Sequence, residues 1–184
     1  TTQVRQSFDS SLTHLGTEYV DSYVLHGPHQ RRGLGEADWE VWAAMEGLYR
    51  SGKTKMIGIS NVTAGQLAEL CEQANLKPMV VQNRCFAALG WDKEVRDICQ
   101  AHGIIYQGFS LLTANRRVLA DPEIRTIAQR LGTGSAQIIF RFAMQIGMLP
   151  LTGTTSPQHM KEDLQAEQFA LSTQEIQRIE TIAL

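Results

Sequence analysis

The stretch Met56–Ala74, MIGISNVTAGQLAELCEQA, decides the fold of this chain. An apolar run, Met56–Ser60, is followed after a short turn by residues with the spacing of an amphipathic helix, Ala64–Ala74. A short apolar strand that leads directly into a helix is typical of a parallel sheet covered by helices. The stretch therefore predicts an α/β protein.

The same alternation extends outward in both directions. The expected strands are Tyr19–Leu25, Met56–Ser60, Met79–Asn83, Ile104–Phe109 and Met148–Thr152. The expected helices are Val4–Leu15 (closed by Gly16), Asp38–Ser51, Ala64–Ala74, Asp92–His102, Pro122–Leu131, Ser135–Ile146, Pro157–Gln168 and Ser172–Ala183, the last with an S-x-x-E capping box. No low-complexity linker interrupts this order, so residues 1–184 are predicted to form a single domain.

Composition excludes several classes of function. The 184 residues are 43% hydrophobic and carry a formal net charge of −2, which gives no basic surface for nucleic acid. No apolar segment approaches the roughly 20 residues of a membrane span, and the start, TTQVRQSFDS, has no signal-peptide core. Cys71, Cys85 and Cys99 lack the spacing of a disulfide framework or a metal site. We therefore expect a cytoplasmic protein with reduced thiols and without a bound metal, nucleic acid or membrane.

Polar residues stand where each predicted strand ends. They are His26, then Ser60 and Asn61, Gln82 and Asn83, Ser110, and Thr152 with Thr154. Strands commonly leave a core through polar residues, so a single position carries little weight. In a parallel β/α array, however, all these ends lie on the face that binds ligands. The pattern predicts one polar rim.

Five segments, in this order and spacing, carry a family resemblance: SFDSSLTHLGTEYVDSYVLHGP, GKTKMIGISNV, PMVVQNRCF, GIIYQGFSLL and GTTSPQHMKEDL. Together they resemble the later part of an aldo-keto reductase, a (β/α)8 barrel that reduces carbonyl compounds with a nicotinamide cofactor. The resemblance covers the whole chain. It implies a partial (β/α)8 TIM barrel of about five parallel strands with covering helices.

The resemblance also implies roles for individual residues. His26 matches the catalytic histidine that lies beside the carbonyl of a small-molecule substrate. Ser60, Asn61 and Gln82 match the positions that hold the nicotinamide carboxamide, and Phe109 matches the aromatic ring stacked on the nicotinamide. Ser110 matches the pyrophosphate loop. In the last segment, Thr154, Thr155 and Ser156 open a helix toward the adenosine phosphate, and His159 and Asp163 belong to the same cofactor-binding segment.

Each position also has a purely structural interpretation. His26 is alternatively a hydrogen-bonded histidine at a strand end. Asn61 is alternatively the cap of the following helix, and Phe109 is alternatively a core residue. We interpret Cys85 and Met79 as packing residues, and His14, His29, His102 and His159 as surface or loop residues.

The resemblance implies an incomplete site. The family uses a tyrosine as proton donor, together with a lysine and an aspartate, all on its first three β/α units. This chain matches the family only from the helix before the fourth strand, and 184 residues fall short of the ~250 typical of the barrel. Tyr19 and Tyr23 are expected inside the first strand, Tyr49 on a helix and Tyr106 in mid-strand, so none replaces the missing tyrosine.

The two edge strands of a partial barrel expose unpaired N–H and C=O groups, which are expected to be covered by another segment or chain. We expect either an N-terminal segment lost from this chain, which the initial Thr1 favours, or a natural truncation that forms a homo-oligomer. Three functions then compete: part of a carbonyl reductase, inactive alone; a cofactor-binding or structural module without turnover; and a half-barrel enzyme with non-redox acid/base chemistry at His26.

Gly153, Thr154 and His159 stand where NADPH-preferring members of the family hold the 2′-phosphate with cations. The expected cofactor is therefore NADP, bound weakly or not at all, with NAD possible.

Overall fold

The structure, a computed structural model, describes residues 2–183 as two compact units. The first unit comprises Thr1–Gln82 and Asp97–Ile105, and the second comprises Asn83–Arg96 and Tyr106–Leu184. Each unit is described by itself below. The prediction of a single domain stays a prediction.

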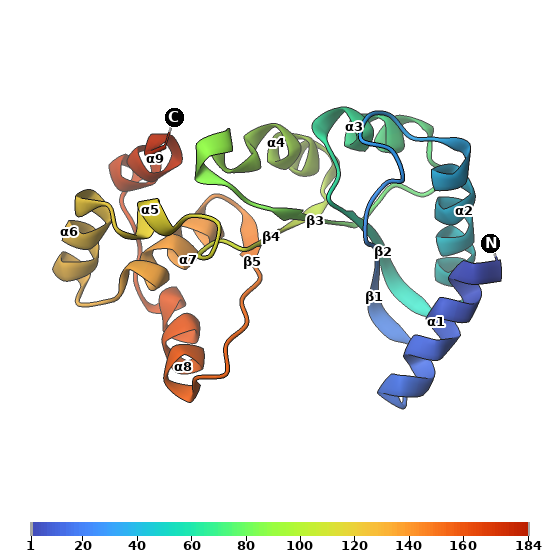
Figure 1. Cartoon of the computed structure of the whole chain (residues 1–184), viewed down its shortest axis with the longest axis horizontal. Helices are drawn as coiled ribbons and strands as arrows, with labels where there is room; N and C mark the ends of the chain where they lie inside the picture. Colours follow the sequence, from blue (N-terminus) through green and yellow to red (C-terminus); the bar gives the residue numbers. More distant parts are fainter. Residues whose placement is uncertain (1, 184) are drawn as a thin grey trace. The chain divides into compact units, whose positions relative to one another are not determined.

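Strands and helices alternate in the first unit (Figure 1). Its elements are α1 (Thr2–Leu15), β1 (Val20–Leu25), α2 (Glu36–Arg50), β2 (Thr54–Ser60), α3 (Ala64–Gln73) and the start of β3 (Val80–Arg84). β1 pairs in parallel with β2, and β2 in parallel with β3, with Ser60 opposite Gln82. The carboxyl ends of these three strands therefore lie at one edge of the sheet, where the predicted site residues are.

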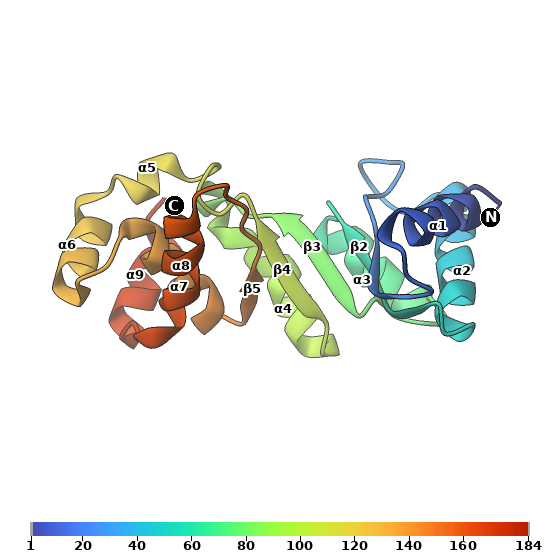
Figure 2. The same cartoon turned by 90° about the horizontal axis from the view of Figure 1, so that it is seen from below.

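The second unit is richer in helix (Figure 2). Its elements are η1 (Ala87–Asp92), the start of α4 (Lys93–His102), β4 (Ile105–Phe109), α5 (Arg116–Leu119), α6 (Pro122–Leu131), α7 (Ser135–Gln145), β5 (Met148–Pro150), α8 (Pro157–Gln165), η2 (Ala166–Gln168) and α9 (Thr173–Thr181). β4 pairs in parallel with β5. The five strands follow chain order across the sheet, β1-β2-β3-β4-β5. The predicted α/β class with five parallel strands is confirmed.

Close packing between strands depends on two glycines. A Cβ at Gly58 in β2 would clash with the carbonyl oxygen of Val80 in β3, and a Cβ at Gly108 in β4 would clash with the Met148 side chain in β5. Each pair of neighbours belongs to one unit. The absence of a side chain at these positions allows the strands and side chains to approach closely.

Three sequence predictions are corrected. Tyr19 lies before β1 and is 44% exposed, because the ladder begins only where the Val20 N–H donates to the Lys53 carbonyl. Asn61 does not cap α3; the cap is Thr63, whose hydroxyl accepts a bond from the Gln66 N–H in a capping box. Between Phe109 and Pro122, where the sequence predicted neither a helix nor a strand, the structure has the short helix α5.

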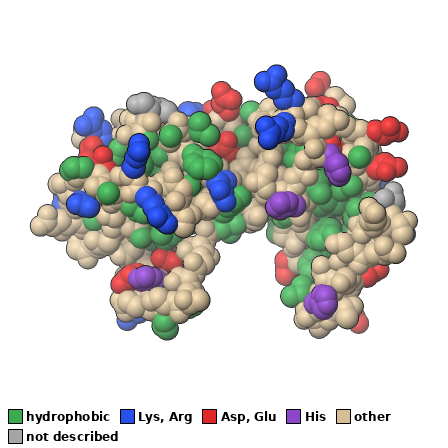
Figure 3. All heavy atoms as spheres, in the orientation of Figure 1, with side chains coloured by type: hydrophobic (Ala, Val, Ile, Leu, Met, Phe, Trp, Pro, Cys, Tyr) green, Lys and Arg blue, Asp and Glu red, His purple; other side chains and the backbone are tan. Residues whose placement is uncertain are grey.

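The core of the first unit is formed by side chains of β2, α2 and α3, including Ile57, Ile59, Trp42 and Leu67. β1 differs from the buried strand predicted from its apolar run. Asp21 and Ser22 are exposed, and Tyr23–Leu25 are only half-buried. Figure 3 shows apolar side chains gathered over the face where β1 and β2 lie. One face of β1 is therefore incompletely covered within this unit.

Helix length and polarity bear on membrane insertion. Between residues 2 and 183, every helix is too short or too polar to cross a bilayer.

Candidate active site

Four of the predicted site residues form one hydrogen-bonded cluster at the carboxyl ends of β1, β2 and β3. The Asn61 Nδ2 donates to the His26 carbonyl oxygen at 2.7 Å and to the Ser60 hydroxyl at 3.1 Å. The Ser60 hydroxyl donates to the Gln82 carbonyl oxygen at 2.6 Å, and the Asn61 backbone N–H donates to the same oxygen at 3.1 Å. The structure thus brings His26, Ser60, Asn61 and Gln82 together, while their binding roles stay predictions.

Asn61 holds this cluster in a strained backbone conformation. Its φ of 52° lies in the left-handed region, which costs a residue with a Cβ about 1 kcal/mol or more. The two hydrogen bonds of its Nδ2 offset part of this cost. Because these bonds occupy the amide N–H groups, the side-chain atom that Asn61 can offer a ligand is the acceptor Oδ1.

Side-chain bonds from α2 and α3 anchor the loop that follows His26. The Gln66 Nε2 donates to the carbonyl oxygens of Gln30 and Gly33 at 2.8 and 2.9 Å. The buried Asp38 carboxylate accepts bonds from the N–H groups of His29 and Gly35 at 2.8 and 2.9 Å. The loop is therefore held from both sides, and this fixes the direction in which the chain leaves β1 at His26.

The His26 side chain is exposed and lines a cavity of about 440 Å³ bounded by α1, β1 and α2. Most of the lining is apolar, with Val24, Val41 and Met45 among its members. Within residues 2–183, no protein group is hydrogen-bonded to the imidazole. The interpretation of His26 as an internally bonded histidine therefore does not fit, and its ring nitrogens are accessible to a small molecule.

In the second unit, Ser110 is the counterpart of Asn61 at the end of β4. Its φ is 59°, so it also adopts the left-handed conformation without being a glycine. Ser110 lines a cavity of about 230 Å³ together with Thr113, Thr152 and Gly153, which follow β4 and β5. In the described part of the chain, only Asn61, Ser110, Trp91 and Asp92 combine a positive φ with a side chain. Two of the four are predicted cofactor residues.

The segment from Thr154 to Asp163 comprises the turn before α8, its N-cap and most of the helix. Ser156 is the N-cap, and its hydroxyl accepts a bond from the His159 N–H at 3.4 Å. The Thr154 hydroxyl accepts from the Ser156 N–H at 3.1 Å. Thr155 is exposed, and Asp163 accepts a bond from the Thr152 hydroxyl at 3.0 Å. Asp163 therefore contacts the β5–α8 loop, and the exposed His159 lies on the first turn of the helix.

Phe109 is half-buried at the end of β4, so the structure excludes a fully buried core position. The guanidinium carbon of Arg84 lies 5.7 Å from the centre of the Phe109 ring. Backbone bonding supports this geometry, because the Cys85 N–H donates to the Phe109 carbonyl oxygen at 3.1 Å. Nothing in the sequence pattern singled out Arg84, since its contact depends on strand pairing.

The Tyr106 hydroxyl belongs to a buried hydrogen-bonded network. It is 3% exposed, and its hydroxyl donates to the Asp92 carboxylate at 2.7 Å, which also accepts a bond from the Asn83 Nδ2 at 2.8 Å. Burial, with the charge of Asp92, raises the pKa of Tyr106. Burial likewise raises the pKa of the neighbouring Cys85 to about 12. This buried network stabilises the turn between β3 and α4.

A tyrosine, a lysine and an aspartate do meet elsewhere in the first unit. The Lys55 Nζ lies 4.5 Å from the centre of the Tyr19 ring and 2.7 Å from an Asp21 carboxylate oxygen. The hydrogen bond to Asp21 raises the pKa of Lys55. These residues lie at the amino ends of β1 and β2, the opposite end from His26. They therefore cannot assist chemistry at His26.

No group of three metal-ligating side chains is found within residues 2–183. The three cysteines are buried.

Comparison with known proteins agrees with this geometry. The Aldo/keto reductase family model matches residues 1–184. The chain is 32% identical over 176 residues to the uncharacterized oxidoreductase YtbE of Bacillus subtilis, covering 96% of this chain and 60% of that protein. It is 30% identical over 185 residues to the NADPH-dependent alpha-keto amide reductase of Saccharomyces cerevisiae, covering 96% of this chain and 59% of that protein. The chain thus spans about 60% of the length of these relatives.

A solved structure gives the same result. The crystal structure of an aldo/keto reductase from Brucella melitensis matches with a TM-score of 0.87 at 28% identity, covering 98% of this chain and 67% of that chain. The five-stranded α/β fold of this chain is therefore shared with an aldo/keto reductase over most of the latter's length. By family model, sequence and fold, the chain belongs to the aldo/keto reductase family.

Proposed function

We propose that this chain carries the part of an NAD(P)H-dependent carbonyl reductase that binds the nicotinamide and orients the substrate carbonyl. The observation that carries the proposal is the cluster around Asn61, which joins His26, Ser60 and Gln82 through a strained residue. Strained backbone kept at a ligand-binding edge of a parallel sheet is a common feature of functional sites. The name of the yeast relative includes NADPH dependence, which supports the choice of cofactor.

The proposed roles follow from donor and acceptor chemistry. A nicotinamide supplies the hydride when bound. Its carboxamide N–H groups suit the Asn61 Oδ1 acceptor, and the half-buried Gln82 lies on the next strand. The exposed His26 imidazole, when neutral, donates one hydrogen bond to the carbonyl oxygen and stabilises the charge that develops there. Ser110 and the start of α8 take the phosphates, where N–H groups and the helix dipole favour negative charge.

The proton donor is the missing element of the proposed site. Hydride transfer leaves an alkoxide that needs a proton, and a positioned acid is typically worth about 10²–10⁴-fold in rate. The Tyr106 hydroxyl is bonded to Asp92, and Tyr19 lies before β1, at the end opposite His26. We therefore propose that the 184 residues alone bind a cofactor weakly and reduce carbonyl compounds poorly.

The test compares Asn61→Gly with Thr63→Ala by fluorescence titration with NADPH. Asn61→Gly keeps the left-handed backbone accessible and removes the amide, so we expect about a tenfold loss of affinity with little change in the free energy of unfolding. Thr63→Ala removes the cap of α3 two residues away, so it should cost about 1 kcal/mol of stability and leave affinity unchanged. Equal affinity of Asn61→Gly and the wild type would contradict the proposed binding role.

A further inference from the structure

The contact between Arg84 and Phe109 places a positive charge beside the ring proposed to stack on the nicotinamide. The guanidinium carbon is 5.7 Å from the ring centre, within the range of a cation–π interaction. Arg84 is exposed, and among the described residues no carboxylate forms an ion pair with it. Its charge is therefore not neutralised by a protein partner.

The backbone holds this pair in place. Arg84 is the last residue of β3, and Phe109 is the last residue of β4. The bond from the Cys85 N–H to the Phe109 carbonyl oxygen joins the two strand ends directly after Arg84. Cys85 itself is fully buried, and the Asn115 Nδ2 donates to its carbonyl oxygen at 2.9 Å. The main chain of Arg84 is thus held beside the end of β4.

The two redox forms of a nicotinamide differ in the charge of the ring. The reduced ring is neutral and the oxidised ring carries a positive charge, while the phosphates are the same in both. Stacked aromatic rings have centres about 4.5–7 Å apart. A ring on either face of Phe109 would therefore lie within roughly 13 Å of the Arg84 guanidinium, close enough for repulsion at low salt.

We infer that Arg84 makes the site discriminate between the oxidised and reduced forms of the cofactor, in favour of the reduced form. This inference rests on the proposed function, because it requires the nicotinamide to stack on Phe109. Arg84 is then a specificity-determining residue: it weakens binding of the product form, favours its release, and biases the site toward carbonyl reduction.

The experiment measures the dissociation constants of NADPH and NADP⁺ by titration calorimetry at low salt, for the wild-type chain and for Arg84→Met and Arg84→Lys. We expect Arg84→Met to lower the preference for the reduced form by about two- to tenfold, mainly by tightening NADP⁺. Arg84→Lys should retain the preference, and raising the salt concentration should reduce it in the wild type. Arg125→Met, at an exposed arginine of α6, is the control and should leave the ratio unchanged.

The outcomes separate this inference from the proposed function. If both forms bind and the ratio is the same in Arg84→Met and the wild type, the inference is wrong and the proposed function stands. If neither form binds the wild-type chain, the proposed function fails and the inference fails with it. Equal effects of Arg84→Met and Arg84→Lys would assign the change to packing on Phe109 and would also overturn the inference.

Discussion

At the scale of single residues, we expect the loop after β5 to determine which cofactor the chain prefers. The exposed His159 and the half-buried Thr154 stand in the segment proposed to meet the adenosine phosphate, and Lys161 lies two residues further on α8, on a different face of the helix. Charge-assisted bonds to a phosphate are worth about 1.5–3 kcal/mol each, and this segment has no lysine or arginine at positions 153, 154 or 159 to form them. We predict weak binding that differs by less than about tenfold between NADPH and NADH. Titration calorimetry with both cofactors at two salt concentrations measures this, and tenfold tighter NADPH binding at micromolar affinity would show that another cation contacts the phosphate.

The buried Cys85 thiol and Tyr106 hydroxyl should make the protein less stable at high pH. Burial raises the pKa of Cys85 to about 12 and also raises that of Tyr106, whereas an unfolded chain releases these protons near pH values of about 8.5 and 10. Above pH 8.5 the unfolded state therefore binds fewer protons than the native state, so the free energy of unfolding falls as the pH rises. We predict constant stability up to about pH 8.5, then a decline toward pH 12. Urea titrations of Cys85→Ala should show a smaller decline between about pH 8.5 and 10, and an unchanged slope would exclude Cys85 as its source.

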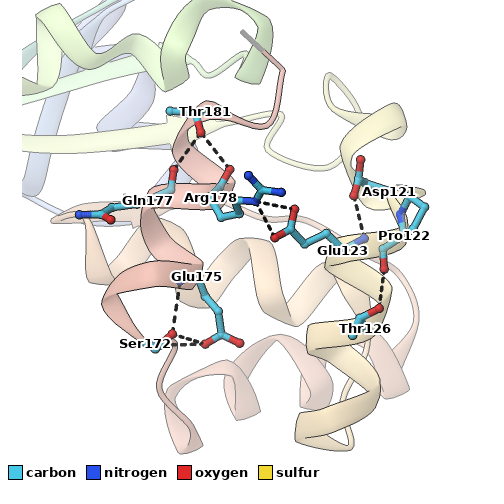
Figure 4. Close-up of polar contacts among 9 residues, drawn as sticks. All are labelled: Asp121, Pro122, Glu123, Thr126, Ser172, Glu175, Gln177, Arg178 and Thr181. Atoms are coloured by element: carbon cyan, nitrogen blue, oxygen red, sulfur yellow. Dashed lines mark hydrogen bonds and ion pairs between the residues drawn. The ribbon is translucent and has the colours of Figure 1, made fainter.

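At the scale of secondary-structure elements, the contacts of α9 allow the stability contribution of a helix cap to be compared with that of a surface ion pair. Figure 4 shows Glu175 and Ser172 in a reciprocal capping box, and Arg178 reaching Glu123 of α6. Burial alone would raise the pKa of Glu175, but bonds from Ser172 and Arg130 lower it below its usual value. We predict that Ser172→Ala costs about 1 kcal/mol in the free energy of unfolding. Arg178→Ala should cost less than about 0.5 kcal/mol, because that side chain is 69% exposed. Urea denaturation of both variants tests the order, and a larger loss in Arg178→Ala would contradict it.

The elements that the sequence predicted well are those with a long local signal. α6 was predicted from Pro122 to Leu131 and has those bounds, because Asp121 caps it and Gly132 ends it in the left-handed conformation. α5 was missed, because four residues are too few to show helical periodicity. Thr63 and Gln66 have the T-x-x-Q spacing of a capping box. This local pattern indicates Thr63, and not Asn61, as the N-cap of α3.

The candidate site was predictable only in part, for a related reason. The ends of parallel strands share one edge, so His26, Ser60, Asn61 and Gln82 could be grouped from the strand pattern and the family resemblance. The contact of Arg84 with Phe109 depends on how two strand ends pair, and the bond from Tyr106 to Asp92 depends on a turn with consecutive left-handed residues. Neither has a signature in local sequence.

At the scale of the whole molecule, the proposed lack of a positioned proton donor leads us to expect little activity. We predict no measurable reduction of simple aldehydes or quinones by the 184 residues with either NADPH or NADH. The Tyr106 hydroxyl is bonded to Asp92, and Tyr19 lies before β1. Tyr23 lines the His26 cavity, and its ring packs edge-on against Phe8. A steady-state assay of cofactor oxidation is the measurement. Turnover that His26→Ala abolishes would disprove this prediction and would favour a half-barrel enzyme that uses His26 as its acid.

The end strands of the sheet lead us to expect self-association. The chain spans about 60% of the length of its relatives, and β1 and β5 are the end members of its sheet. Unpaired N–H and C=O groups at sheet edges favour pairing with another strand. Leu149, in the middle of β5, is 49% exposed, and the apolar residues of β1 are only half-buried. We therefore propose that isolated chains form a dimer or larger oligomer with an interface above about 1,000 Å² that includes β5.

Sedimentation velocity at micromolar concentration tests this proposal. The wild-type chain should sediment as an oligomer, and Leu149→Lys should shift it toward the monomer, because a charge at the centre of an edge strand opposes strand pairing. Leu164→Lys is the matched control: Leu164 is 78% exposed but lies on the helix α8 and not in a strand, so it should leave the sedimentation coefficient unchanged. A folded wild-type monomer would refute the proposal, since it would mean that the open strands tolerate solvent without a partner.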